Sequence, residues 1–388
     1  MKKPSKKARN AIKRLNESNL NFFIRYANSE RHHKRKKRCY QLWLDHSVDG
    51  LRVKARKNIF NSLCREYTFN KAPLIVKITD EFGLEEKHNL HNYLEQCAGF
   101  VDFNGSSLTI DLSDCTRIWP SAITSLCSLS QWIELASRKG NKPIISQIPS
   151  KDQKVNSYMD LCGLYDYVKI RKKEDTSYYK KDDVVKIRRE MDKRNIEIRE
   201  EEILSLVERH SSLDAEQLEW FYSVILTEIF NNVTEHGISH KDNGWWLLAQ
   251  YHKRHKIISL CIADNGIGVR NSLLTGPQKK EILKEIENSP LNDGLFIKKA
   301  MEENVSGAIT ASTKERETLI FKKYKSGSRR GNGLKRIQDT CRHLGIELAI
   351  LSHHGCLTLD AEGRETTCKS LAKRVVAGTM YQLNIPTN

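Results

Sequence analysis

The chain has no long hydrophobic run and no closely spaced pair of cysteines. No stretch of 18 or more apolar residues occurs, so we expect no membrane-spanning helix and no membrane partner. The ten cysteines are scattered, and none forms the CxxC pair typical of zinc ribbons and thioredoxin-like proteins. The N-terminus is basic but lacks the apolar stretch and cleavage site of a secretory signal. These absences favour a cytoplasmic protein with reduced thiols.

Acidic residues are scarce in the first 60 positions. Residues 1–60 hold 18 lysines and arginines against 4 acidic residues, a net charge of +14 out of +17 for the chain. Aromatic residues, among them Tyr40 and Trp43, lie beside the densest basic run. Basic side chains bind phosphates and aromatic side chains stack on bases, so we consider nucleic acid or another polyanion as a partner. The alternative is a basic tail that orders only against another protein. The polyanion-binding candidates are Lys34, Arg35, Lys36, Lys37 and Arg38.

Four segments follow from the sequence pattern. They are a basic region at 1–70, an α/β domain at 71–170, a charged linker with an entering strand at 171–200, and a larger α/β domain at 201–388. The order strand, helix, strand, helix predicts the smaller α/β domain. Within the larger domain we expect 269–330 to form a mobile lid, because its end carries Gly, Ser and Lys clusters and no core pattern.

A polar stripe marks the first motif of the larger domain. Glu228, Asn232 and His236 recur at every fourth position, which places them on one face of a helix with otherwise largely apolar residues. An asparagine supplies a neutral oxygen for Mg²⁺, and a glutamate one turn earlier can act as a general base toward water. His236 either joins the site or only ends the helix before Gly237, since both roles suit that position.

Two glycine motifs follow the polar stripe. Asp264 closes an apolar strand and is followed by Gly266 and Gly268, which we expect to take positive φ values and to approach a ligand closely. The Asp264 carboxylate suits the exocyclic amine of adenine. Gly331 and Gly333 precede a predicted helix, whose N-terminal amides can bind phosphates.

These motifs and the Gly378-Thr379 strand, in this order, resemble the GHKL ATPases, the superfamily of gyrase, MutL and the histidine kinases. The resemblance implies an α/β fold of the α+β sandwich kind: a Bergerat-type ATP-binding domain with a mixed sheet and helices on one face. It also implies ATP and Mg²⁺ as cofactors, Glu228 as the catalytic residue and Asn232 as the Mg²⁺ ligand. The implied ATP-binding residues are Asn232, His236, Asp264, Gly266, Gly268, Lys325, Arg329, Arg330, Gly331, Gly333 and Thr379.

The smaller domain resembles STAS domains, the fold of anti-sigma-factor antagonists. The resemblance rests on the strand-and-turn sequence at 110–126, on Lys139-Gly140 before a strand, and on Gly163-Leu164 near the end of the domain. Ser121 falls where that family carries a phosphoacceptor serine, although the Asp and Gly that flank it there are absent. Ser121 is therefore either a phosphoacceptor or a cap of the following helix.

Three functions agree with these features. The first is a Mg-ATP-dependent ATPase or nucleotide switch whose lid closure is coupled to the STAS-like domain and the basic arm. The second is a protein serine kinase like the anti-sigma-factor kinases, acting on Ser121 in cis or on a partner protein. The third is a nucleic-acid-binding effector gated by ATP. A histidine sensor kinase is disfavoured, because no dimerisation helix with a phosphoacceptor histidine precedes the ATP motifs. The sequence is compatible with a monomer or a homodimer.

Deletion of residues 1–60 tests the polyanion prediction. If this region binds RNA or DNA, the affinity of the full chain should fall steeply between 50 and 200 mM salt, because bound cations are released from the phosphates. The deleted variant should lose this affinity, as measured by fluorescence anisotropy with a labelled oligonucleotide. Equal affinity of both chains would contradict the prediction.

Overall fold

The computed structural model describes 48–65, 72–85, 90–101, 103, 105–136, 143–168, 180–190, 195–234, 244–303, 305 and 332–387. The candidate polyanion-binding residues, Lys34 to Arg38, lie outside these ranges. Within them, no helix is both long and apolar enough to cross a membrane. Eight cysteine side chains are described, all of them free thiols, and seven are buried.

A small parallel sheet forms the first domain. Its three strands are β1 (Leu74–Phe82), β2 (Ser107–Ile118) and β3 (Ile144–Ile148), in the order β1-β2-β3. Parallel neighbours need crossover connections, and helices α5 (Leu90–Val101) and α6 (Pro120–Ala136) supply the two that this sheet needs. A third helix, α7 (Gln153–Cys162), follows β3. The predicted order of strands and helices is confirmed at this level. A 3₁₀ turn, Leu164–Asp166, ends the domain.

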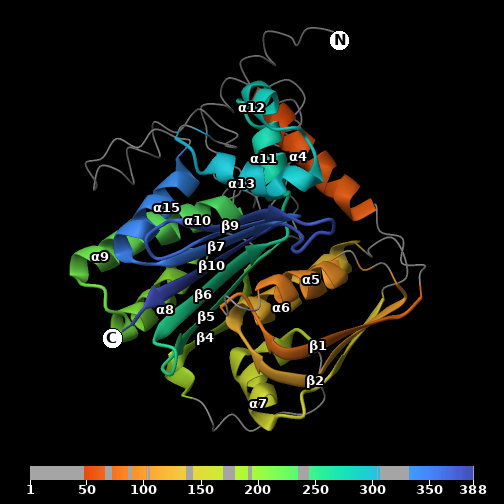
Figure 1. Cartoon of the computed structure of the whole chain (residues 1–388), viewed down its shortest axis with the longest axis vertical. Coiled ribbons are helices and arrows are strands. Elements are labelled where there is room, and N and C mark those ends of the chain that lie inside the picture. Colours follow the sequence, from red (N-terminus) through yellow and green to blue (C-terminus); the bar gives the residue numbers. More distant parts are fainter. Residues whose placement is uncertain are drawn as a thin grey trace, which may run out of the picture.

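A seven-stranded sheet forms the second domain, in the order β4-β5-β6-β10-β7-β8-β9 (Figure 1). Every pairing in it is antiparallel, so the prediction of a mixed sheet is wrong. The reason is that hairpins join β5 to β6, β7 to β8 and β8 to β9, while β10 enters between β6 and β7 antiparallel to both. The strands are β4 (Val184–Glu190), β5 (Trp245–His252), β6 (Ile257–Asp264), β7 (Glu347–Ser352), β8 (Gly355–Leu359), β9 (Glu365–Ser370) and β10 (Thr379–Pro386).

Helices cover one face of this sheet (Figure 1). The helix predicted to carry Glu228 and Asn232 is the last part of a helical segment that divides into α9 (Ala215–Trp220), a π-helix (Phe221–Leu226) and α10 (Thr227–Asn232). A capping box between Asp214 and Gln217 starts it. π turns inside helices are frequent at functional sites, and this one ends two residues before Glu228. Helix α8 (Ile196–His210), which follows the 3₁₀ turn Lys181–Asp183 and β4, and helix α15 (Gly333–Leu344) also lie on this face.

Part of the segment predicted as a lid is helical and packed. It holds α11 (Gly268–Thr275), α12 (Lys279–Glu285), a 3₁₀ turn (Pro290–Asn292) and α13 (Asp293–Ala300). Phe296 and Ile297 of α13 are fully buried. A Cβ atom on Gly294 would lie 2.7 Å from the Lys369 carbonyl oxygen, so α13 packs directly on β9. Helix α4 (Val48–Arg65) lies beside α11 (Figure 1). Residues 306–331 lie outside the described ranges.

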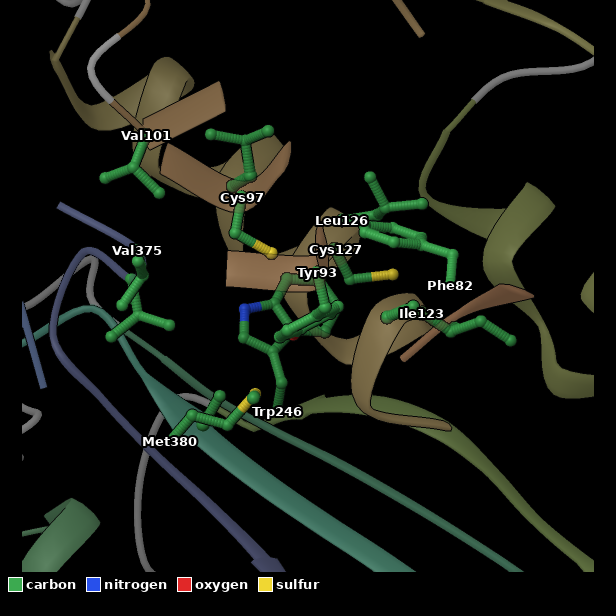
Figure 2. Close-up of a cluster of buried hydrophobic side chains, with 14 of the residues drawn as sticks. Phe82, Tyr93, Cys97, Val101, Ile123, Leu126, Cys127, Trp246, Val375 and Met380 are labelled. Carbon is green, nitrogen blue, oxygen red and sulfur yellow. The ribbon is translucent and has the colours of Figure 1, made fainter. Parts of the chain in front are cut away.

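The other face of the seven-stranded sheet is covered by the first domain. Successive residues of a strand point to opposite faces, so Trp246 and Met380 face α5 and α6, while Leu247 and Tyr381 face α8, α10 and α15. Figure 2 shows Trp246, Met380 and Val375 opposite side chains of the first domain, including Tyr93 and Ile123. The fold class predicts helices on one face of the sheet, and these are present. Helix α6 covers the opposite face as an additional layer. The two domains share one hydrophobic core.

Replacement of Trp246 tests this shared core. Trp246→Ala should lower the free energy of unfolding by about 3–5 kcal/mol, because it leaves a cavity between the domains and removes an indole N–H donor. Trp246 is 2 % exposed, whereas Trp220 is 45 % exposed, so Trp220→Ala is a matched control with a much smaller effect. Urea unfolding followed by circular dichroism measures both. Equal losses in the two variants would refute the shared core.

Candidate functional site

Two predicted motifs meet at the start of α15. Gly333, its first residue, packs against α10 so closely that an added Cβ atom would lie 3.1 Å from Glu228 Oε2 and 3.9 Å from Asn232 Oδ1. Glu228 and Asn232 are one helical turn apart, as their spacing predicts. The first turn of α15 carries no acidic side chain. A carboxylate, a carboxamide and the positive end of a helix therefore converge at one place.

Arg336 is a fourth member of this cluster. Its guanidinium Nη1 donates a short hydrogen bond to Glu228 Oε1, and both side chains are largely buried. A cation in the first turn of a helix is unfavourable by itself, because the helix dipole is positive there. The ion pair with Glu228 offsets that cost. It also holds the carboxylate against the first turn of α15.

Asp264 lies at the end of β6 on the face that carries the helices. Residue pairing aligns Asp264 with Thr379 of β10, and Thr379 in turn with Ser352 of β7. All three residues are buried. The Ser352 hydroxyl lies 3.5 Å from the Thr379 hydroxyl and accepts a hydrogen bond from the Val269 amide at 2.8 Å. Asp264 and Thr379, both predicted to bind ATP, thus form one row of polar side chains with Ser352, across three neighbouring strands.

Tyr381 connects this row to α10. It lies two residues after Thr379 on β10, so its side chain emerges on the same face. The Tyr381 side chain interacts with Asn232 and with the charge of Asp264. Burial first, and then the Asp264 charge, raise the pKa of Tyr381, so the phenol stays protonated. Asp264, Tyr381, Asn232 and Glu228 form a continuous set of polar groups on the helix side of the sheet.

Glycines let the chain pack tightly around Asp264. A Cβ atom on Gly378 would lie 2.4 Å from the Gly266 nitrogen and 2.6 Å from Asp264 Oδ1, so only glycine fits. The Gly266 amide donates to Asp264 Oδ1 at 2.7 Å. Gly268 has φ +72°, as predicted, and a Cβ atom on it would lie 2.9 Å from the His353 ring. The prediction of a positive φ at Gly266 is wrong, because this residue is used for its amide and for close approach.

Burial controls the charge of Asp264. Removal from water raises the pKa of its carboxyl to about 7, and the amides of Gly266 and Thr379 partly oppose this by donating to the charged form. The group therefore titrates near neutral pH. A ligand amine that donates to the carboxylate would favour its ionised form.

A magnesium ion would need ligands beyond the protein at this place. The described residues contain no group of three or more His, Cys, Asp and Glu side chains that could hold a metal. The Asn232 side-chain nitrogen is buried and makes no hydrogen bond of normal geometry within the described part of the chain, although the Tyr381 phenol is close enough to interact with it. Since rotation of an amide exchanges its nitrogen and oxygen, this carboxamide has an open coordination or hydrogen-bonding position beside Glu228. That suits Mg²⁺, which takes few protein ligands and bridges phosphates.

Five of the predicted ATP-binding residues fall outside the described residues: His236, Lys325, Arg329, Arg330 and Gly331. Gly333, Asn232, Asp264, Gly266, Gly268 and Thr379 are described and lie around the polar set or its supporting loop. Their roles toward ATP stay predictions.

Ser121 lies away from this set, on the opposite face of the sheet. It is the second residue of α6 and is fully buried. Its hydroxyl accepts from the Leu84 amide at 2.8 Å and donates a short hydrogen bond to Glu85. Glu85 also accepts from Ser259 of β6 at 2.7 Å. Ser121 is thus linked to the second domain through Glu85, and its buried hydroxyl would have to become exposed before it could be phosphorylated. Its hydroxyl bonds groups in another segment and is not a helix cap.

Two members of the site escape sequence reasoning. Arg336 has a detectable signal, since an arginine three residues after Gly333 occupies a helix turn that disfavours cations. Tyr381 has none, because an aromatic residue in an apolar strand is ordinarily a core residue.

Comparison of the chain with family models, with curated proteins and with solved structures found no match in any of the three. The case for function therefore rests on the residues and their geometry.

Asp264→Asn tests the buried carboxyl. The pKa of Asp264 is raised in the folded state, so the folded chain binds more protons than the unfolded chain between about pH 4 and pH 7. The stability of the wild type therefore falls as the pH rises from about 4 to 7. Asparagine cannot ionise. The variant should therefore gain stability over wild type as pH rises from 5 to 8, by a few kcal/mol at most, since each pKa unit is about 1.4 kcal/mol.

Asp114→Asn is the matched control. Hydrogen bonds from Lys151 first and Lys77 next lower the pKa of Asp114 to about 2, so this carboxylate is ionised at both pH 5 and pH 8. Its replacement should change stability equally at the two pH values. Urea unfolding at pH 5 and pH 8 measures all three chains. A pH-independent effect of Asp264→Asn would contradict the raised pKa.

Proposed function

We propose that this chain is a Mg-ATP-binding ATPase or nucleotide switch of the GHKL type. One observation carries the proposal: motifs that are far apart in sequence converge on the helix side of one antiparallel sheet. Gly333 lies against Glu228 and Asn232, and Thr379 lies beside Asp264. Tyr381 connects the two pairs. Chance matches to short motifs would have no reason to meet in space.

Each residue has a distinct part in this proposal. The Asp264 carboxylate accepts a hydrogen bond from the adenine amine, and the buried position makes that bond selective, because an unpaired group there is costly. The amides at the start of α15 receive phosphate oxygens. Glu228 accepts a proton from the attacking water, and Asn232 offers an oxygen to Mg²⁺. Mg²⁺, when bound, neutralises charge on the phosphates.

Arg336 has two possible partners in this scheme. In the structure it neutralises Glu228. A phosphate group at the start of α15 would compete for the same guanidinium, because arginine binds phosphate as readily as carboxylate. Transfer of Arg336 from Glu228 to a phosphate would leave the carboxylate free to act as a base.

A protein serine kinase is the second candidate, favoured by the joining of an STAS-like domain to the same chain. Ser121 is a poor substrate in cis, since it is buried between the domains. A separate STAS-like protein is the better substrate for this activity. Thin-layer analysis of products from γ-labelled ATP separates free phosphate from phosphoprotein.

Turnover of ATP by point variants tests the proposal. Glu228→Gln should retain ATP binding and lose roughly 10²–10⁴-fold in turnover, because the amide cannot take a proton. Asn232→Ala should weaken the dependence on Mg²⁺. Glu219→Gln, at an exposed position of α9, is the matched control and should behave as wild type. Equal turnover by wild type, Glu228→Gln and Asn232→Ala would refute the assignment.

A further inference from the structure

Asn265 connects the Asp264 loop to the first domain. It directly follows Asp264, and its side chain is fully buried. Its Oδ1 accepts from the Ser128 hydroxyl at 2.7 Å, and its Nδ2 donates to the Ser128 carbonyl at 2.8 Å and to Gln131 Oε1 at 3.2 Å. Ser128 and Gln131 belong to α6. One carboxamide therefore makes three hydrogen bonds to a helix of the other domain.

The Gln131 side chain of α6 makes a further hydrogen bond to the second domain. Gln131 Oε1 also accepts from the indole N–H of Trp246, on β5, at 2.7 Å. Gln131 and Trp246 are each 2 % exposed. Buried polar groups are costly to leave unpaired, so α6 cannot shift along the sheet without breaking these bonds together. The pairing holds one position of α6 over the end of β6.

The loop that carries Asn265 has little room to move independently of Asp264. The Gly266 amide bonds the Asp264 carboxyl, and Gly378 packs against both. Farther along, the Val269 amide bonds Ser352. A displacement of Asp264 toward a ligand would therefore displace the neighbouring Asn265, whose amide is fixed to α6.

A second contact joins the same loop to α4. Helix α11 begins at Gly268, directly after the loop. The buried Arg56 of α4 donates from Nε to the Thr275 hydroxyl of α11 at 3.0 Å. Phe60 of α4 stacks edge-on against Trp132 of α6. The segment from Asp264 to Thr275 thus contacts two helices that precede the second domain, and one of them, α4, lies within the basic region at 1–70.

We propose that Asn265, held by Ser128 and Gln131, is a positioning residue that makes nucleotide affinity at Asp264 and the seating of α6 on the sheet depend on each other. The inference rests on the proposed function, because it takes adenine as the ligand of Asp264. By linkage, α6 affects nucleotide affinity as much as the nucleotide affects α6. The first domain is then the part of the chain that responds to the nucleotide.

Ser128→Ala tests the inference from the side of α6, where no nucleotide contact is proposed. Loss of one hydrogen bond to Asn265 should loosen the Asp264 loop. The Kd for the non-hydrolysable analogue adenylyl imidodiphosphate with Mg²⁺, and the KM for ATP, should rise about 5-fold or more, within the usual range of coupling energies. The kcat should stay unchanged, because Glu228 is intact. A loss of fold alone would not raise KM while leaving kcat unchanged.

Ser146→Ala is the matched control in the same domain. Its hydroxyl bonds Thr109 on the exposed side of the small sheet, away from α6. This variant should keep the wild-type Kd. As a second measurement, amide hydrogen exchange across α6 of the full chain should change when the analogue is added to wild type, and change less in Ser128→Ala.

The outcomes separate the inference from the function on which it rests. If wild type binds the analogue but Ser128→Ala binds equally well, or α6 exchange is indifferent to the analogue, the coupling is wrong and the ATP site stands. If wild type does not bind the analogue, the proposed function fails and the inference fails with it.

Discussion

The strict alternation of side chains along β5, β6 and β10 is the constraint on which the rest of the structure depends. The seven-stranded sheet is buried on both faces, so each residue of these strands commits to one core or the other. A shift of one residue in register would exchange Tyr381 with Met380 and Leu247 with Trp246. The same shift would move Asp264 from the helix side to the face that α6 covers.

Tight packing makes the chain rigid around Asp264 and its neighbouring loops. Gly378, Gly268 and Gly294 lie where a side chain would collide with neighbouring backbone or rings. Close-packed segments do not deform gradually, so a change at Asp264 is carried to its neighbours as a shift between discrete positions. The polar contacts between domains then decide where such a shift can go. Among the polar contacts of α6 with the second domain are the bonds of Ser128 and Gln131 to Asn265, the bond of Gln131 to Trp246, and the link of Ser121 through Glu85 to Ser259.

Much of the local structure was predictable from the sequence. Most strands of both sheets, and the position of Glu228 and Asn232 on one helix face, follow from short-range periodicity. β9 was not predicted, because its residues are exposed or half-buried and do not alternate between buried and exposed. The π turn before Glu228 was missed since it leaves the helical apolar pattern almost unchanged. The helices between Gly268 and Ala300 were missed, because the Gly, Ser and Lys clusters near the end of the predicted lid favour a loop over the whole segment.

The sequence by itself determined the chemical groups and their local order: a carboxylate and a carboxamide on one helix, an aspartate ending a strand, and glycines where the chain must approach itself. Only the tertiary structure decided which of them meet. Arg336 pairs with Glu228 across 108 residues, and Asn265 bonds Ser128 across 137. Local periodicity assigns a side chain to a face of its own element. What that face meets is decided by how the sheet and helices pack, which short-range patterns do not encode.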